Sequence, residues 1–160
     1  MTRRARLRRS LVLIPLVAAT LAACTTAAPQ RMVGTDDVVF DRQRIMKVQG
    51  AMWTDIQNKF KAGNIEAIAP NAEVIAITAM QIPTLFPEGS LTEKSKAKPE
   101  LWQRRKEFED AARNLTVWAE RLRNASMAKD EKAVADIMKD FGRVGCGTCH
   151  TPFRQPPPRS

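Results

Sequence analysis

Two cysteines and a histidine near the end of the chain have the spacing of a haem-attachment site. Cys146, Cys149 and His150 form a C-x-x-C-H motif. Each thiol of such a motif can add to a vinyl group of haem, and the histidine that follows the second cysteine is then held beneath the iron as an axial ligand. The motif therefore predicts one haem c, attached covalently through Cys146 and Cys149 and bound at the iron by His150.

Three other uses of the cysteine pair remain open at this point. An oxidising compartment favours a disulfide. Thioredoxin-like redox sites also use C-x-x-C, but they lie at the start of a helix that follows a strand, where the helix dipole activates the thiol. Structural zinc requires four ligands, and the sequence has no second cluster of cysteine or histidine. Because this pair follows a helical pattern, haem attachment is the preferred interpretation.

Four stretches with helical periodicity must position the motif, and none shows the sustained alternation of a strand. The expected helices cover residues 35–61, residues 64–79, a stretch from about 99 through 122, and a stretch from about 130 to before 156. Thr35 is the candidate N-cap of the first helix. Pro70 should kink or restart the second helix. We expect residues 87–98, which are rich in lysine, to form the longest loop.

The apolar residues of these stretches recur at bundle spacing. In the third helix they stand seven residues apart, at Leu101, Phe108, Leu115 and Leu122. Amphipathic helices with mostly short connections pack as bundles, and bundles build cofactor sites between facing helices. The sequence therefore predicts an all-α fold, an antiparallel up-down-up-down four-helix bundle that holds haem near the C-terminal end of the chain.

The first residues indicate export. Five arginines precede the apolar run from Leu11 to Ala23, which is too short to span a bilayer as a helix. The run ends in Leu21-Ala22-Ala23-Cys24, which resembles a lipobox. We therefore expect lipidation at Cys24 and a periplasmic location with a membrane anchor. An ordinary signal peptide, with Cys24 incidental, is the alternative.

The chain is thus divided into four parts by this interpretation. They are a lipoprotein-type signal peptide (1–23), a lipidated N-terminus and spacer (24–34), a four-helix haem domain (35–155) and a Pro-rich tail (156–160). Removal of the first part takes away five arginines and lowers the formal charge from +9 to +4. A charge this small gives no reason to expect nucleic acid as a partner.

Several short segments occur in the order typical of one known family. They are Arg42-Gln43-Arg44-Ile45-Met46-Lys47, Leu85-Phe86-Pro87, Pro99-Glu100-Leu101-Trp102, and Val144-Gly145-Cys146-Gly147-Thr148-Cys149-His150 followed by Phe153-Arg154. With the haem motif close to the C-terminus, the chain resembles the class II c-type cytochromes, the cytochrome c-prime family. The resemblance covers about residues 37–154 and implies the four-helix fold and the covalent haem.

The resemblance also implies a second iron ligand. In the gas-binding branch of the family an apolar residue on the first helix leaves the iron five-coordinate, whereas in the low-spin branch a methionine at that place binds the iron. This chain has Met46 there, followed by Lys47 as in the low-spin branch. His150 is the only histidine, so a second histidine ligand from the same chain is excluded by counting. A methionine at helical spacing usually serves packing alone. If Met46 is such a packing residue, Met52 and Met138 are the reserve candidates for the second ligand.

Ligation by histidine and methionine favours electron transfer, since it raises the reduction potential and changes little between ferric and ferrous iron. We therefore expect a periplasmic monohaem electron carrier that cycles Fe(III)/Fe(II), is not an enzyme, and serves redox partner proteins. The alternative is a gas-binding, five-coordinate protein that scavenges or senses nitric oxide or carbon monoxide, with Met46 as a packing residue or labile ligand. A binding or structural lipoprotein without haem is a third possibility.

Two further expectations follow from the resemblance. Arg154 lies four residues after His150, near the proximal side of the haem, where its charge could pair with a propionate; a solvated terminal cation is the alternative. Members of the family are often dimers that pack through the first helix, so a homodimer through residues 35–61 is expected, although Met52 and Trp53 could equally belong to the core.

Overall fold

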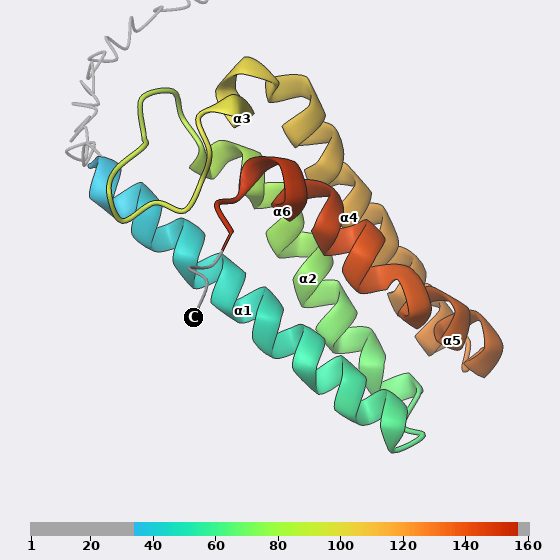
Figure 1. Ribbon diagram of the computed structural model, residues 1–160. Coiled ribbons are helices and arrows are strands. Elements are labelled where there is room, and N and C mark those ends of the chain that lie inside the picture. The colour runs from blue at the N-terminus through green and yellow to red at the C-terminus, as the bar shows by residue number, and fades with distance from the viewer. Residues whose placement is uncertain (1–33, 157–160) are drawn as a thin grey trace, which may run out of the picture. The chain divides into compact units, whose positions relative to one another are not determined.

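The structure is a computed structural model that describes residues 34–156, and within that range it is helical (Figure 1). In chain order the elements are α1 (Thr35–Lys61), η1 (Glu66–Ile68), α2 (Ala69–Gln81), η2 (Ile82–Leu85), α3 (Glu100–Gln103), α4 (Arg105–Met127), α5 (Glu131–Asp140), η3 (Phe141–Cys146) and α6 (Gly147–Phe153). Here η1 and η2 are 3-10 turns and η3 is a π-helix. The expected signal peptide, the lipidation site Cys24 and most of the tail lie outside the described residues.

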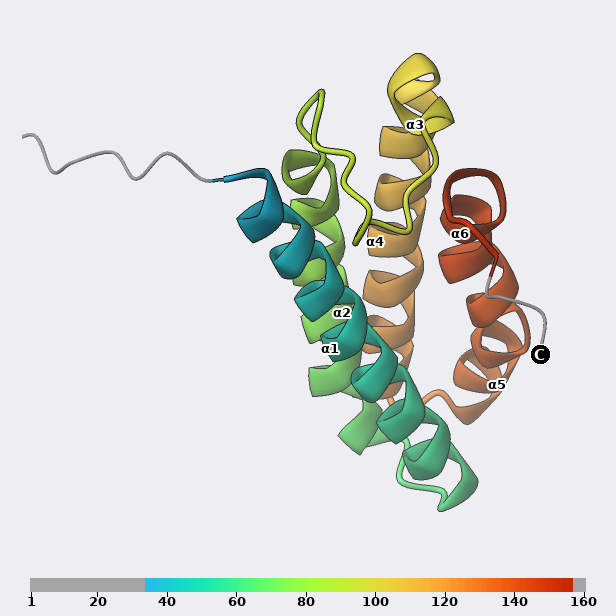
Figure 2. The same cartoon turned by 60° about the vertical axis from the view of Figure 1, so that its left-hand side comes forward.

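The described part of the chain is the predicted antiparallel four-helix bundle. Its four columns are α1, α2, α3 with α4, and α5 with η3 and α6 (Figures 1 and 2). The turns between columns use left-handed backbone at Gly63 (φ 73°) and at Lys129 (φ 55°). After Lys129, the side chain of Asp130 caps α5 by accepting a hydrogen bond from the Ala133 amide. No helix in residues 34–156 is long and apolar enough to cross a membrane.

The bundle core comes from the apolar positions that the spacing predicts. Ile56, Leu101, Leu122, Val134 and Phe141 have no measurable exposure. They occupy recurring apolar positions on α1, α3, α4, α5 and η3, so the periodicity of the sequence translates directly into one shared core.

The helix ends differ from the sequence prediction in three places. The second helix was expected from residue 64 but begins at Ala69, because Pro70 occupies its first turn, where a missing amide hydrogen has no cost. The expected third helix is interrupted at Arg104 (φ −114°, ψ 43°). At the start of α1 the N-cap is Gly34 and not Thr35, and the Asp37 carboxylate accepts a hydrogen bond from the Gly34 amide.

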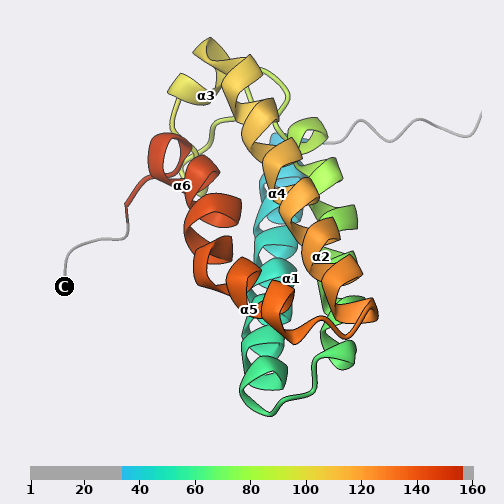
Figure 3. The same ribbon diagram turned by 90° about the vertical axis from the view of Figure 1, so that its right-hand side faces the viewer.

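The fourth predicted helix is a bent column of three pieces. α5 passes through the π-helix η3 into α6, which Figure 3 shows as one continuous column along an edge of the bundle. A π-helical segment adds a residue to the turn and often marks a functional site. Here it leads directly into the cysteine motif, which begins at Cys146.

The first column stands apart from the last one. The backbone of α1 comes within 8 Å of α2, η1 and η2, but not of α5, η3 or α6 in the described chain. Side chains of the two columns still meet at one point, where the rings of Trp53 on α1 and Phe141 on η3 stack with centroids 4.7 Å apart and planes 14° from parallel. The space between α1 and α6 lies on the side of this stack that faces the start of α1.

A long loop, residues 86–99, bridges the two separated columns, and we call it the strap. On one side the Arg42 guanidinium of α1 donates to the Ser90 carbonyl oxygen (2.9 Å). On the other side the strap pairs with the segment after α6, with backbone hydrogen bonds from Lys98 to Phe153 (2.9 Å) and from Gln155 to Lys96 (2.8 Å). The strap is therefore an ordered closure over one end of the bundle (Figure 1).

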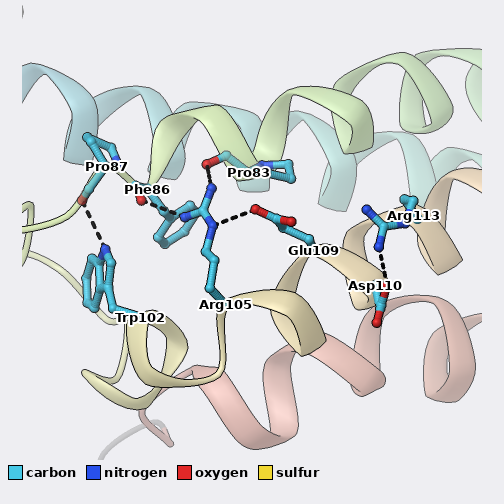
Figure 4. Close-up of polar contacts among 8 residues, drawn as sticks. All are labelled: Pro83, Phe86, Pro87, Trp102, Arg105, Glu109, Asp110 and Arg113. Atoms are coloured by element: carbon cyan, nitrogen blue, oxygen red, sulfur yellow. Dashed lines mark hydrogen bonds and ion pairs between the residues drawn. The ribbon is translucent and has the colours of Figure 1, made fainter.

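The base of the strap is fixed by the corner between α3 and α4. The Arg105 guanidinium donates to the carbonyl oxygens of Pro83 (2.7 Å) and Phe86 (2.8 Å) and to the Glu109 carboxylate (2.7 Å). The Trp102 indole donates to the Pro87 carbonyl oxygen at 3.0 Å (Figure 4). These bonds give side-chain donors to carbonyl groups in and just after η2, and so tie the start of the strap to the corner between α3 and α4.

Candidate functional site

The cysteine motif is positioned by contacts between the last column and α4. The Asn114 side-chain amide donates to the Val144 carbonyl oxygen at 2.6 Å, and the Thr148 hydroxyl donates to the same oxygen at 2.8 Å. Gly145 is buried against α4, and a Cβ atom added there would lie 3.3 Å from Leu115 Cδ1. The motif therefore starts from a segment that is pressed closely onto the neighbouring helix.

Both cysteines are partly buried, and no disulfide joins them. Burial raises the pKa of Cys146, and burial together with the neighbouring Cys146 raises the pKa of Cys149 to about 11. Redox-active C-x-x-C pairs require the opposite, a lowered thiol pKa, so this environment disfavours the thioredoxin-like alternative. Within residues 34–156 no three side chains of His, Cys, Asp or Glu gather as a metal-binding cluster, which leaves the zinc alternative without its ligand set.

His150 follows on α6 and faces the space between the columns. Burial lowers its pKa, and the charge of Arg154 lowers the pKa further. A neutral imidazole is the form that binds a metal ion. The surroundings of His150 are thus suited to an iron ligand.

Two adjoining cavities, of about 130 and 270 Å3, occupy the space between α1 and α6. Both are lined by Met46, Ile82, Cys149 and His150, so we treat them as two lobes of one site. The smaller lobe continues toward Cys146 and has no charged side chain in its lining; we call it the apolar lobe. The larger, which we call the cationic lobe, lies under the strap.

The charged residues that line the cationic lobe are all basic, namely Arg42, Lys47, Lys96 and Arg154. Of these, Arg154 is the one that the sequence predicts as a site residue, and Lys47 is predicted only as a feature of the family. Arg154 does not continue α6, which ends at Phe153, but its amide donates to the His150 carbonyl oxygen at 3.1 Å. Arg42 and Lys96 were missed, because the approach of the strap to the N-terminal part of α1 leaves no periodic signal in the sequence.

Only one of the three candidate methionines lies at this site. Met46 lines both lobes together with His150. The sulfur of Met52 instead accepts a hydrogen bond from the buried Asn71 side chain (3.6 Å), which directs it toward α2. Met138 packs against the core and lines neither lobe. The structure thus brings Met46, Cys146, Cys149 and His150 to one cavity.

The cavity matches haem in its chemistry. Haem c is apolar over its ring and carries two carboxylates, and the site combines an apolar lobe beside two thiols with a lobe lined by four cations. A buried carboxylate requires a paired charge, and the cationic lobe offers several. The residues present therefore fit the cofactor.

Comparison with known proteins gives the same answer for the whole domain. Residues 37–154 match the family model described as Cytochrome C'. The chain belongs to the cytochrome c' family. A cytochrome c' from Pararhodospirillum photometricum is 33% identical over 93 residues, which cover 58% of this chain and 73% of the relative.

Solved structures of cytochromes c' share the fold. The protein from Thermochromatium tepidum matches with a TM-score of 0.69 and 24% identity, over 77% of this chain and 98% of its own. A nitric oxide complex of a variant from Alcaligenes xylosoxidans matches with a TM-score of 0.68 and 21% identity, over 77% of this chain and 97% of its own. This cytochrome c' is therefore a four-helix c-type haem protein, with one haem attached covalently through Cys146 and Cys149.

Proposed function

We propose that this cytochrome c' is an electron carrier in which His150 and Met46 would both bind the haem iron. One observation carries the proposal: among the candidate methionines, Met46 alone shares the cavity with His150. Haem supplies one-electron chemistry when it is bound. A neutral thioether on the second side keeps the coordination nearly unchanged between oxidation states, which favours electron transfer over ligand binding.

The reduced absorption spectrum of the holoprotein, recorded with and without carbon monoxide, tests this proposal. We expect sharp low-spin bands that carbon monoxide leaves unchanged. The Met46→Leu variant should become high-spin and bind the gas, whereas the matched control Met52→Leu should keep the wild-type spectrum. A wild-type spectrum that already shifts with carbon monoxide would contradict electron transfer as the function.

The comparisons favour a second candidate, gas binding, over electron transfer. Solved relatives include nitric oxide complexes and a carbon monoxide-bound form of variants from Alcaligenes xylosoxidans. In this candidate Met46 packs against the ring or leaves the iron readily, and the protein scavenges or senses nitric oxide. A broad high-spin reduced spectrum that carbon monoxide shifts, with little change in Met46→Leu, is the result that selects it. Neither candidate requires the protein to be an enzyme.

Arg154 is proposed to pair with a haem carboxylate. It lines the cationic lobe and is bonded through its amide to the His150 carbonyl oxygen. The side chain is exposed, so the pair should be weak and sensitive to salt. If Arg154 is only a solvated cation, Arg154→Gln will leave the reduction potential unchanged at low ionic strength.

We propose that residues 1–23 direct export to the periplasm, that Cys24 carries the lipid anchor, and that residues 24–34 link the anchor to the haem domain of residues 35–155, with residues 156–160 as a tail. The support is the order of arginines, apolar run and Leu21-Ala22-Ala23-Cys24. Metabolic labelling with a fatty acid tests it: wild type should gain the label and Cys24→Ala should not. Equal labelling of the two proteins would refute the anchor.

A homodimer through α1 is also proposed. A solved relative is described as a cytochrome c' with an unusual ligand-controlled dimer dissociation. On α1 of this chain the Phe40 side chain is 64% exposed, so an apolar ring is available for contact with a second copy. Sedimentation of the holoprotein should give a dimer that Phe40→Glu weakens, and a monomer at all concentrations would exclude it.

A further inference from the structure

The mouth of the cationic lobe carries an uncompensated positive charge. Lys47 on α1, Lys96 on the strap and Arg154 after α6 are exposed and line this lobe. We call these three residues the mouth cations. No Asp or Glu side chain lines the lobe, and none of the described residues places a carboxylate within 4 Å of a mouth cation.

The rest of the described surface is arranged differently. Along α4 and the last column most basic side chains are paired with acids of the same column, as in Lys106 with Asp110 (2.7 Å) and Arg143 with Asp140 (2.6 Å). Even Lys94, on the strap itself, pairs with Asp36 at 3.2 Å. Some basic side chains of the described residues also lack an ion pair elsewhere, such as Lys61 and Arg121, but only at this opening do several of them line one cavity.

Haem does not cancel this charge. Its two carboxylates can neutralise at most two of the four cations that line the lobe. Arg42 is only 5% exposed and is fixed to the strap, so it stays next to the cofactor. When Arg42 and Arg154 pair with the two carboxylates, Lys47 and Lys96 still extend into solvent with their charges unpaired. A net positive opening remains over the cofactor when the site is filled.

We infer that the mouth cations form the docking face for a redox partner with an acidic surface. The inference rests on the proposed electron-transfer function. Complementary charge raises the rate of productive encounter and fixes orientation more than it raises affinity. A partner held at this opening lies next to the cofactor cavity, so its orientation shortens the path of the electron.

Electron transfer to small oxidants of opposite charge tests the face on the intact holoprotein. In each reaction one electron leaves the reduced protein and no atom is transferred: ferricyanide becomes ferrocyanide, and tris(phenanthroline)cobalt(III) becomes the cobalt(II) complex. Lys96→Glu should slow the anionic oxidant at least about threefold at about 0.01 M salt and speed the cationic one, since charges act over roughly 30 Å there and only about 8 Å at 0.15 M.

The matched control is Lys61→Glu, which makes the same change of net charge at the exposed far end of α1. For both oxidants, the change in the logarithm of the rate constant should be less than half of the change caused by Lys96→Glu. A second readout, independent of redox chemistry, is the anisotropy of labelled poly-glutamate, whose affinity should fall in Lys96→Glu and Arg154→Glu more than in the control. Equal effects of Lys61→Glu in both assays would overturn the inference. Carbon monoxide binding by the wild type would instead refute the proposed function, so the two failures are distinguishable.

Discussion

The side-chain amide of Asn114, on α4, donates a 2.6 Å hydrogen bond to the Val144 carbonyl oxygen, two residues before the first haem-attachment cysteine. A π-helix loosens the regular hydrogen bonding of the main chain. A hydrogen bond from α4 therefore helps to fix the position of the segment that leads into Cys146. It ties the attachment segment to the longest helix of the last two columns.

Replacement of Asn114 by leucine should weaken this anchorage. Because the Thr148 hydroxyl still donates to this carbonyl, the loss of one hydrogen bond should lower the free energy of unfolding by about 0.5–1.5 kcal/mol. We also expect a smaller fraction of chains with two thioether bonds, which intact mass measurement after co-expression with a haem-attachment system would reveal. Asn58→Leu, at an exposed position of α1, serves as the control and should have neither effect.

Two glycines of the π-helix give a paired test of close packing. A Cβ atom at Gly142 would meet nothing within 4 Å, whereas at Gly145 it would lie 3.3 Å from Leu115 Cδ1 and 3.6 Å from the Phe141 ring. Gly142→Ala should raise the free energy of unfolding by about 0.5–1 kcal/mol, because alanine loses less entropy in a helix. Gly145→Ala should instead lower it by about 1 kcal/mol through overpacking. Urea titration of both holoproteins decides, and a gain at Gly145 as large as at Gly142 would contradict the packing argument.

The Trp53 and Phe141 stack should be a main link between α1 and the last column. Trp53→Leu keeps an apolar side chain but removes the stack, for which we expect a loss of about 1 kcal/mol in the free energy of unfolding. Trp118→Leu, on α4, removes a ring that lies 5.0 Å from the Arg121 guanidinium carbon and should cost less. Thermal unfolding followed by circular dichroism compares the two; a larger loss for Trp118→Leu would show that the stack is unimportant.

Asp136 should contribute to stability in a defined range of pH. Hydrogen bonds and charge attraction from Lys132 and Lys139 lower its pKa from 3.8 to about 2. A lowered folded-state pKa means that the contribution is complete above the unfolded pKa and is lost as the pH falls from about 4 toward 2. The difference in unfolding free energy between wild type and Asp136→Asn should therefore shrink over this range. A difference that stays constant from pH 5 to pH 2, or that salt does not reduce, would contradict the ion pairs.

The sequence predicted the fold wherever apolar periodicity controls structure. The seven-residue spacing of Leu101, Phe108, Leu115 and Leu122 became the core face of the third column, and α1 has the predicted bounds. A π-helix of six residues is too short to give a periodic signal of its own, and the single non-helical residue Arg104 leaves the seven-residue spacing of Leu101 and Phe108 intact. The break at Arg104 and the π-helix were therefore missed.

The candidate site was predictable to a similar degree. A motif of five residues was sufficient for Cys146, Cys149 and His150, and its resemblance to a family added Met46. The charge pattern of the opening was not predictable, because Lys47 and Lys96 are 49 residues apart in sequence and meet only through the path of the strap. Their proximity depends on main-chain hydrogen bonds between the strap and the segment after α6, and on the bonds of the Arg42 side chain to the strap. Neither set of bonds leaves a periodic pattern in the sequence.

The strap is joined to the segment after α6 by main-chain hydrogen bonds, Lys98 to Phe153 and Gln155 to Lys96. Any residue except proline can provide such bonds. Substitutions can therefore change the side chains of the strap one at a time while its main-chain bonds to the last column persist. Under the proposed electron-transfer function, a lineage that acquires a new electron donor or acceptor can change the mouth cations by point mutation while the main-chain bonds of the strap are kept.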